Sequence, residues 1–183
     1  MKQWPVPQSL SRDLPSPPSS GSFWEDRGDR HHCGVDIYAP RGSEVVSVMD
    51  GKVVDTGMFT SPDEMHYWNI TFYVIVRNRD GMYCRYAEMG TLAVETEERV
   101  RKGDRLGQVG QVLEKTKITG GDPTYIQKLK EASTECMLHL EVYSDPMVPK
   151  PGSGDYRGGN WFGKERPSNL IDAGKYLLEE ILG

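Results

Sequence analysis

Two short segments carry the side chains of this chain that are best suited to hold a metal ion. They are His32-Cys33-Gly34-Val35-Asp36 and Met137-Leu138-His139-Leu140-Glu141, and together they supply two imidazoles and a carboxylate. Two imidazoles and one carboxylate form the ligand set of a catalytic zinc site with one open position. The second segment has Met137 where a catalytic partner would be expected. The pattern therefore indicates a metal site more firmly than it indicates catalysis.

Strand geometry decides which of these side chains can meet. Residues on an extended strand alternate between faces, so His139 and Glu141 share one face. His32 and Asp36 also share a face, but on a straight strand they would lie roughly 13 Å apart. The donor atoms of two zinc ligands each lie about 2.0–2.2 Å from the ion, so the chain must bend between them. Gly34 is the residue type that allows such a bend.

The composition of the chain excludes several classes of function. The 183 residues have a formal net charge of -5, which provides no basic surface for nucleic acid. No apolar run approaches the length of a membrane span. The cysteines Cys33, Cys84 and Cys136 are odd in number and irregularly spaced, so they indicate neither a disulfide scaffold nor a zinc ribbon. We therefore expect no nucleic-acid partner and no membrane span.

The first 22 residues differ in character from the rest of the chain. They contain five prolines and no apolar stretch that could act as a signal peptide. We expect an arm or linker over residues 1–22 and a single domain over residues 23–183. The sequence is compatible with two locations: the cytoplasm, or an exported location if a leader has been removed from the chain.

The centre of the chain is predicted to be antiparallel β-structure. Asp-Gly between β-branched or aromatic runs is a strong hairpin signal, because both central turn positions need positive φ. This signal occurs at Asp50-Gly51 and at Asp80-Gly81. We expect strands over residues 44–49, 52–56, 73–78, 82–88 and 136–143, and a short strand pair within 100–109.

Two helices are expected beside these strands. Asp122-Pro123 combines an N-cap with a proline at the first helical position, which predicts a short inserted helix through residue 132. Asp172 is an N-cap for a C-terminal helix that reaches Leu182. The glycine-rich and aromatic span 149–167 is expected to be a long surface loop. The predicted fold class is mostly β: an antiparallel hairpin core with an inserted short helix and a C-terminal helix.

Read in order, four blocks of the chain resemble the lysostaphin-type (LytM-like) zinc endopeptidases, which cut peptide cross-links of bacterial cell walls. The blocks are RHHCGVDIYAPRG at 30–42, the stretch ending in DGKVV at 45–54, RKGDRLGQVG at 101–110 and LHLEV at 138–142. They fit the family's patterns HxGxD-(I/L)-xAPxG, V-x-A-x-x-DG-x-V, V-x-x-GQ-x-I-G-x-x-G and LHFEV. The resemblance implies the antiparallel core of that peptidase domain, which is similar to the duplicated hybrid motif.

The resemblance also implies a cofactor and a substrate class. By analogy, His32, Asp36 and His139 bind Zn²⁺. The chain would then be a zinc-dependent metalloendopeptidase, a hydrolase that acts on peptidoglycan-type or other short peptides through a zinc-activated water.

Two positions depart from the family pattern. Glu88 follows Tyr86-Ala87 where the family has a histidine, and Met137 replaces the first histidine of the family's HxH. In the family these two histidines flank the water and the developing oxyanion, and one such donor is worth on the order of 10²–10³ in rate. Glu88 is a candidate general base, or alternatively a fourth ligand that would close the site. Met137 cannot replace its histidine, because a thioether has no proton to donate.

Two functions therefore stay open. The first is a zinc peptidase with Glu88 as the base. The second is a catalytically degenerate relative that binds zinc and uses the groove as a peptide- or protein-binding module.

Several other residues are candidates for roles around the metal ligands. Glu141, His31 and Arg85 are candidates for groups that contact and orient the ligands or the substrate. His66, in a loop, could supply the missing imidazole, although a surface histidine is the simpler expectation. Cys84 is expected near the site because it shares strand parity with Glu88.

Overall fold

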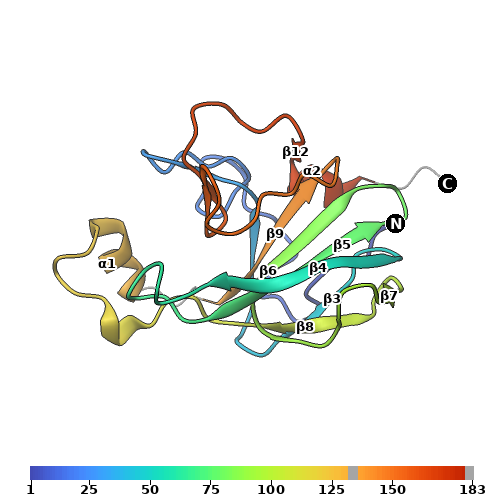
Figure 1. Cartoon of the computed structure of the whole chain (residues 1–183). Coiled ribbons are helices and arrows are strands. Elements are labelled where there is room, and N and C mark those ends of the chain that lie inside the picture. The colour runs from blue at the N-terminus through green and yellow to red at the C-terminus, as the bar shows by residue number, and fades with distance from the viewer. Residues whose placement is uncertain (132–135, 180–183) are drawn as a thin grey trace.

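The structure is a computed structural model that describes residues 1–131 and 136–179. Within those ranges, nine strands form one twisted antiparallel sheet and three short strands form a second, smaller sheet (Figure 1). The strands are β1 His31–His32, β2 Val35–Tyr38, β3 Glu44–Val46, β4 Gly51–Thr60, β5 Thr71–Asn78, β6 Tyr83–Leu92, β7 Arg99–Val100, β8 Arg105–Val109, β9 Met137–Tyr143, β10 Tyr156–Arg157, β11 Asn160–Trp161 and β12 Leu170–Ile171. The helical elements are η1 Lys115–Lys117, α1 Thr124–Glu131 and α2 Ala173–Leu178. The predicted fold class, mostly antiparallel β with an inserted and a C-terminal helix, is confirmed.

The large sheet brings distant parts of the chain together. Its path runs β12-β9-β6-β5-β4-β7, with β2 paired to β9 and β8 paired to both β3 and β6. The small sheet has the order β1-β11-β10. The strands β5, β6 and β9 are mostly buried and supply many of the apolar side chains of the main core.

The hairpin predicted at Asp80-Gly81 is present, since β5 and β6 pair antiparallel on either side of it. The hairpin predicted at Asp50-Gly51 is wrong: β3 pairs with β8, and β4 pairs with β5 and β7. The Asp50 carboxylate instead accepts a hydrogen bond from the backbone amide of Lys102, 2.8 Å away. The chain bends over residues 48–50 and β4 begins at Gly51, but the partner of each strand is set by distant contacts.

The strand pair predicted within residues 100–109 is also wrong. A turn at Gly103, with φ of 87°, separates β7 from β8. The two strands then join different neighbours, β7 on β4 and β8 on β3 and β6. The span 149–167 is more than a surface loop, because it forms β10 and β11 and buries Tyr156.

Both helices begin where predicted. The Asp172 side chain caps α2 by accepting a hydrogen bond from the Lys175 amide. Residue 132 of the first predicted helix and Leu182 of the second lie outside the described residues. Figure 1 shows α1 at one end of the large sheet, away from α2. Around α1 lies a second, smaller apolar cluster, made of Tyr67, Leu113, Ile118 and Ile126.

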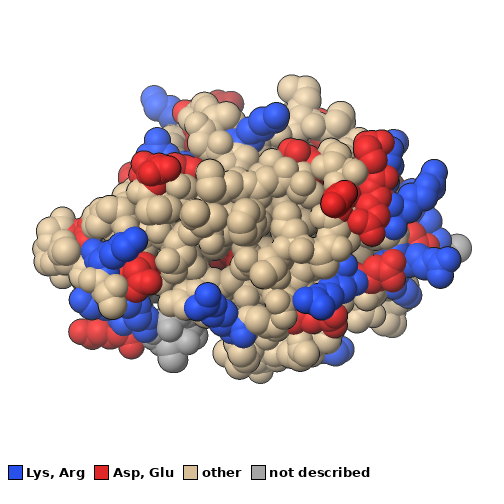
Figure 2. Space-filling model, turned by 60° about the horizontal axis from the view of Figure 1, so that its bottom comes forward, with Lys and Arg blue, Asp and Glu red and all other residues tan. Residues whose placement is uncertain are grey.

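The first 22 residues lie along the domain. Val6 is fully buried in the main core, and the Val46 amide donates a hydrogen bond to the carbonyl of Pro5. Among the described residues, no helix has the length and apolar character needed to cross a membrane. Figure 2 shows one face on which basic and acidic side chains intermix mostly around the edge of a wide uncharged area.

Candidate metal centre and its cleft

The bend expected at Gly34 is present and divides the first segment between the two sheets. His32 pairs with Asn160 in the small sheet, whereas Asp36 pairs with His139 in the large sheet. A Cβ atom at Gly34 would lie 2.3 Å from the carbonyl oxygen of Leu140, so only glycine permits this close approach to β9. The bend leaves Nε2 of His32 3.2 Å from Oδ1 of Asp36.

Three donor atoms from these segments converge in the interior. Nε2 of His32 and Nδ1 of His139 lie 2.9 Å apart, and Oδ1 of Asp36 lies 3.0 Å from Nδ1 of His139. All three residues are buried, and within the described residues they are the one group found with metal-ligand spacing. Ligand atoms of a tetrahedral zinc lie about 3.3–3.6 Å from one another. The observed separations are within a few tenths of an ångström of that geometry, so the donor set fits zinc.

The outer nitrogen of each imidazole is occupied by an acceptor. Nδ1 of His32 lies 2.9 Å from the carbonyl oxygen of Ser22, and Nε2 of His139 lies 2.8 Å from Oε1 of Glu141. Each outer nitrogen must therefore carry a proton and donate it. The inner nitrogens then face each other with lone pairs, an arrangement that a cation stabilises. Imidazoles oriented in this way by a carbonyl or carboxylate are typical of metal ligands.

Hydrogen bonds and charges within this cluster shift the pKa values of its members. Burial alone would lower the pKa of His139, but hydrogen bonds to Asp36 and Glu141 outweigh it and raise the pKa to about 10. Burial opposes ionisation of Asp36 as well, yet the charge of His32 and the hydrogen bonds from both histidines hold the pKa of this carboxyl well below its usual range. The two carboxylates therefore favour a positive charge on the His139 imidazole between them.

Glu141 is held by a buried network behind His139. Its carboxylate accepts hydrogen bonds from Nη1 of Arg85 at 2.8 Å, from the Tyr143 hydroxyl at 2.8 Å and from the Tyr156 hydroxyl at 2.5 Å. Burial opposes its ionisation, but the charge of Arg85 outweighs burial and lowers the pKa of Glu141 to about 2. Arg85 also donates to the Pro149 carbonyl, which ties the segment carrying Tyr156 to β6.

Replacing Tyr156 by phenylalanine is expected to destabilise the protein by about 1.5–3 kcal/mol, because it removes a buried hydrogen bond to a charged group. Urea unfolding at pH 7 measures this loss. Tyr83→Phe is the matched control, since Tyr83 is half-buried on β6 of the large sheet and its hydroxyl makes no hydrogen bond among the described residues. Equal stabilities for the two variants would contradict the role of Tyr156.

Glu88 enters the site through a bulge in β6. Tyr86 and Met89 pair with Val74 and Phe72, so two residues of β6 lie opposite one residue of β5. Glu88 has a φ of 63°, which is uncommon for a residue with a side chain. The amide of Gly110 donates a 2.8 Å hydrogen bond to its carbonyl and supports this conformation.

The bulge overturns the predicted position of Cys84. Strand parity placed Cys84 beside Glu88, but the extra residue turns Glu88 into the cleft while Cys84 stays in the core. Cys84 is fully buried and accepts a hydrogen bond from Nδ2 of Asn78. It lies near Tyr176 of α2, away from the three donor atoms.

The pKa of Glu88 predicts a pH dependence of stability. Burial and the nearby Asp36 carboxylate raise its pKa from 4.5 to about 8. A carboxyl group with a raised pKa stabilises the fold fully below its unfolded pKa, and this stabilisation is lost as the pH rises through the folded pKa. We expect the zinc-free protein to lose at least about 1 kcal/mol between pH 5 and pH 8 relative to Glu88→Gln, which has no proton to lose. Parallel urea-unfolding profiles for the two proteins would contradict this expectation.

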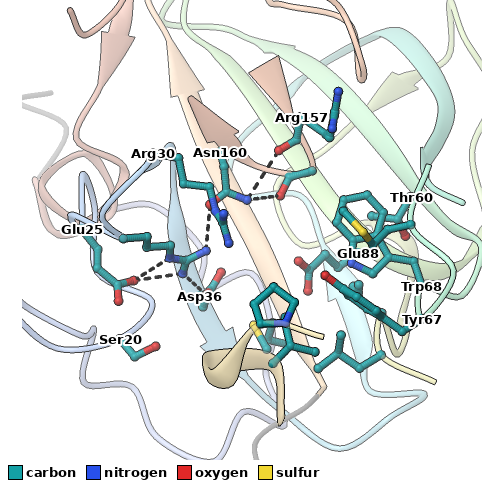
Figure 3. Close-up of a pocket in the computed structure, with 18 of the residues that line it drawn as sticks. Ser20, Glu25, Arg30, Asp36, Thr60, Tyr67, Trp68, Glu88, Arg157 and Asn160 are labelled. Carbon is teal, nitrogen blue, oxygen red and sulfur yellow. Dashed lines mark hydrogen bonds and ion pairs between the residues drawn. The ribbon is translucent and has the colours of Figure 1, made fainter. Parts of the chain in front are cut away.

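A cleft of about 840 Å³ reaches the donor set at Asp36, while His32 and His139 lie buried behind it. Asp36, Glu88 and Met137 line it, so both positions that depart from the family pattern lie at the cleft. Figure 3 shows the labelled side chains of Asp36 and Glu88 between a polar side with Glu25, Arg30 and Asn160 and an aromatic side with Tyr67 and Trp68.

Arg27 lies beside Asp36, a contact that the sequence did not predict. Its guanidinium donates to Glu25 at 2.9 Å and to Asn160 at 2.9 Å, and it lies 3.8 Å from Oδ2 of Asp36. The Ser22 carbonyl is a second contact that sequence reasoning missed. A backbone acceptor leaves no signal in residue type, and the pairing of Arg27 with Asp36 depends on the chain folding back over β2.

The remaining candidates lie apart from the donor atoms. His31 stacks on Trp24, with ring centroids 4.5 Å apart. His66 has a side chain that is 57% exposed and pairs with Asp122 at 3.3 Å, so it does not supply an imidazole to the donor set. Gly159, with φ of 75°, passes so close to His139 that a Cβ atom would lie 2.6 Å from its Nε2. The small sheet therefore packs directly on the imidazole.

Comparison with known proteins relates this geometry to a family. The model of peptidase family M23 matches residues 30–149, which include all three donor residues and Glu88. The cell division protein DipM of Caulobacter vibrioides is 31% identical over 140 residues, which cover 70% of this chain and 19% of DipM. The chain thus spans about a fifth of the length of that relative.

A solved structure has a similar fold. The catalytic domain of the antimicrobial peptidase lysostaphin from Staphylococcus simulans is similar with a TM-score of 0.55 at 16% identity, over 88% of this chain and 91% of that domain. Helicobacter pylori Csd3 is 26% identical with a TM-score of 0.47, over 81% of this chain and 33% of Csd3. The mostly antiparallel β fold of this chain thus resembles that of the lysostaphin catalytic domain.

Proposed function

Because the chain belongs to peptidase family M23, we propose that it is a zinc-dependent endopeptidase that hydrolyses peptide bonds in peptidoglycan-type substrates. The observation that carries this proposal is the convergence of His32, Asp36 and His139 at the side of a cleft that Glu88 also lines. A family of peptidases, a three-residue donor set and an adjacent carboxylate together favour hydrolysis.

Different residues of the chain would hold the ion and orient its ligands. When bound, zinc supplies Lewis acidity and lowers the pKa of water. His32, Asp36 and His139 would hold the ion, with Ser22 and Glu141 fixing the two imidazoles.

Glu88 would act as the general base. Its carboxylate would accept a proton from the attacking water and return it to the leaving amide nitrogen. A pKa near 8 in the ion-free site would fall beside a bound cation, which favours the carboxylate form needed at neutral pH.

A binding module is the second candidate, and Met137 is the observation that favours it. Met137 lines the cleft and offers no proton to a developing oxyanion. If the chain only binds, zinc-loaded protein would retain peptidoglycan peptides uncut, and the double substitution Glu88→His with Met137→His would create cleavage.

Incubation of zinc-loaded protein with purified peptidoglycan tests the proposal. We expect new amino termini to appear in the soluble fraction, to disappear with a chelator and to return when zinc is restored. No new amino termini from protein with one zinc per chain would overturn the proposed activity.

A further inference from the structure

One side of the cleft is almost entirely apolar. Six side chains form it, and we call them the apolar wall. They are Met65, Tyr67, Trp68, Val112, Leu113 and Ile126. Tyr67, Leu113 and Ile126 are buried, whereas the other three are only half-buried and leave apolar surface exposed to the cleft. Apolar surface lining a concave site is the usual means of gripping an apolar ligand group.

The apolar wall is a separate unit with its own support. Its buried members belong to the small cluster around α1 and are distinct from the main core. The Glu114 amide donates a 2.9 Å hydrogen bond to the Tyr67 carbonyl, and the Asn69 amide donates a 2.6 Å bond to the Val112 carbonyl. These bonds join the segment before β5 to the segment after β8. The wall is therefore held in place before any ligand binds, which limits the entropy lost on binding.

The opposite side of the cleft is polar, and its arginine side chains already form hydrogen bonds or ion pairs within the protein. Arg27 is bound to Glu25 and Asn160, and Arg30 lies 2.9 Å from Asp29. Asp36 and Glu88 lie between this side and the apolar wall (Figure 3). A peptide that crosses the donor set would thus have polar groups on one side and apolar surface on the other.

We infer that the cleft selects peptides with a bulky aliphatic side chain adjacent to the scissile bond, packed against Met65, Trp68 and Val112. The inference rests on the proposed function, because it assumes that a peptide lies across the donor set. Glycine or alanine at that position would leave the apolar wall exposed to solvent, whereas a leucine side chain would cover it. Burial of one leucine side chain corresponds to about a tenfold to hundredfold gain in affinity.

Matched peptides test this inference. The probes are acetylated tetra-alanine amides in which one residue, moved through the four positions, is leucine or glycine. Dissociation constants are measured by calorimetry on zinc-loaded Glu88→Gln protein, and kcat/KM is measured on zinc-loaded wild type. At one position we expect leucine to bind at least about tenfold more tightly than glycine.

The double variant Met65→Gln with Val112→Thr is expected to remove most of that preference while glycine peptides bind as before. Both replacements keep the approximate shape of the side chain, and thermal unfolding checks the fold. Met58→Gln is the matched control, because Met58 is 50% exposed on β4 and does not line the cleft.

Three outcomes would overturn the inference: equal affinity for leucine and glycine at every position, a preference that survives the double variant, or no binding of either peptide. Failure of the proposed function would look different. Cleavage would then be absent from wild type, while the leucine preference in binding and its loss in the double variant would persist.

Discussion

Zinc binding is expected to be lost when His139 is replaced by alanine. The variant removes one of the three donor atoms found among the described residues and leaves those of His32 and Asp36. Loss of a group that merely orients a ligand costs about 10–100-fold in metal affinity, so loss of the ligand itself is expected to cost more than about 100-fold. Elemental analysis of protein purified without chelators measures the effect. We expect one zinc per chain in the wild type and less than about a tenth of that in the variant.

His66→Ala is the matched control for this experiment. His66 is the exposed histidine that pairs with Asp122, so its removal is expected to leave zinc content unchanged. Zinc retained by His139→Ala, or absent from wild-type protein with an intact fold, would contradict the assignment of the ligands. Unfolding curves of the zinc-free proteins separate loss of the ligand from loss of the fold.

Replacing Glu88 by glutamine is expected to lower kcat by about 10²–10⁴, the range that a general base contributes. Zinc content is expected to stay at one per chain, because glutamine removes the base but none of the three donor atoms. Release of new amino termini from peptidoglycan measures the rate. Glu97→Gln is the matched control, since Glu97 is an exposed glutamate that also has a positive φ, of 78°.

The same variant distinguishes the two roles open to Glu88. If Glu88 is a fourth ligand that closes the site, the variant would bind zinc more weakly and wild-type protein would be inactive. If Glu88 has neither role, both zinc content and kcat would match those of Glu97→Gln.

Local signals in the sequence predicted the elements whose partners are near in the chain. The hairpin at Asp80-Gly81 joins β5 to β6, and its turn residues alone favour this pairing. The Asp50-Gly51 signal is equally strong, but β3 lies on β8, some sixty residues later in the chain. A turn motif reports the backbone angles that its residues prefer. It carries no information about which distant strand completes the sheet.

In the candidate site too, the sequence predicted local geometry but not the contacts or irregularities that the tertiary structure imposes. Alternation along β9 places His139 and Glu141 on one face, and they are hydrogen-bonded to each other at 2.8 Å. The need for a bend at Gly34 also follows from the residues alone. Alternation fails at Glu88, because a bulge adds one residue to β6 and reverses the face of the side chain.

By itself, the sequence determined the class of fold, the family and the residue types of the three-residue donor set, because these depend on short motifs with fixed geometry. Only the tertiary structure decided how the donor atoms meet, since His32 and His139 lie on different sheets. It also decided that Arg85 and two tyrosines hold Glu141, and that an apolar wall faces Asp36 across the cleft. Apart from the bond between Tyr143 and Glu141, those contacts join residues distant in the chain, and such contacts form only when the sheet closes and buries them.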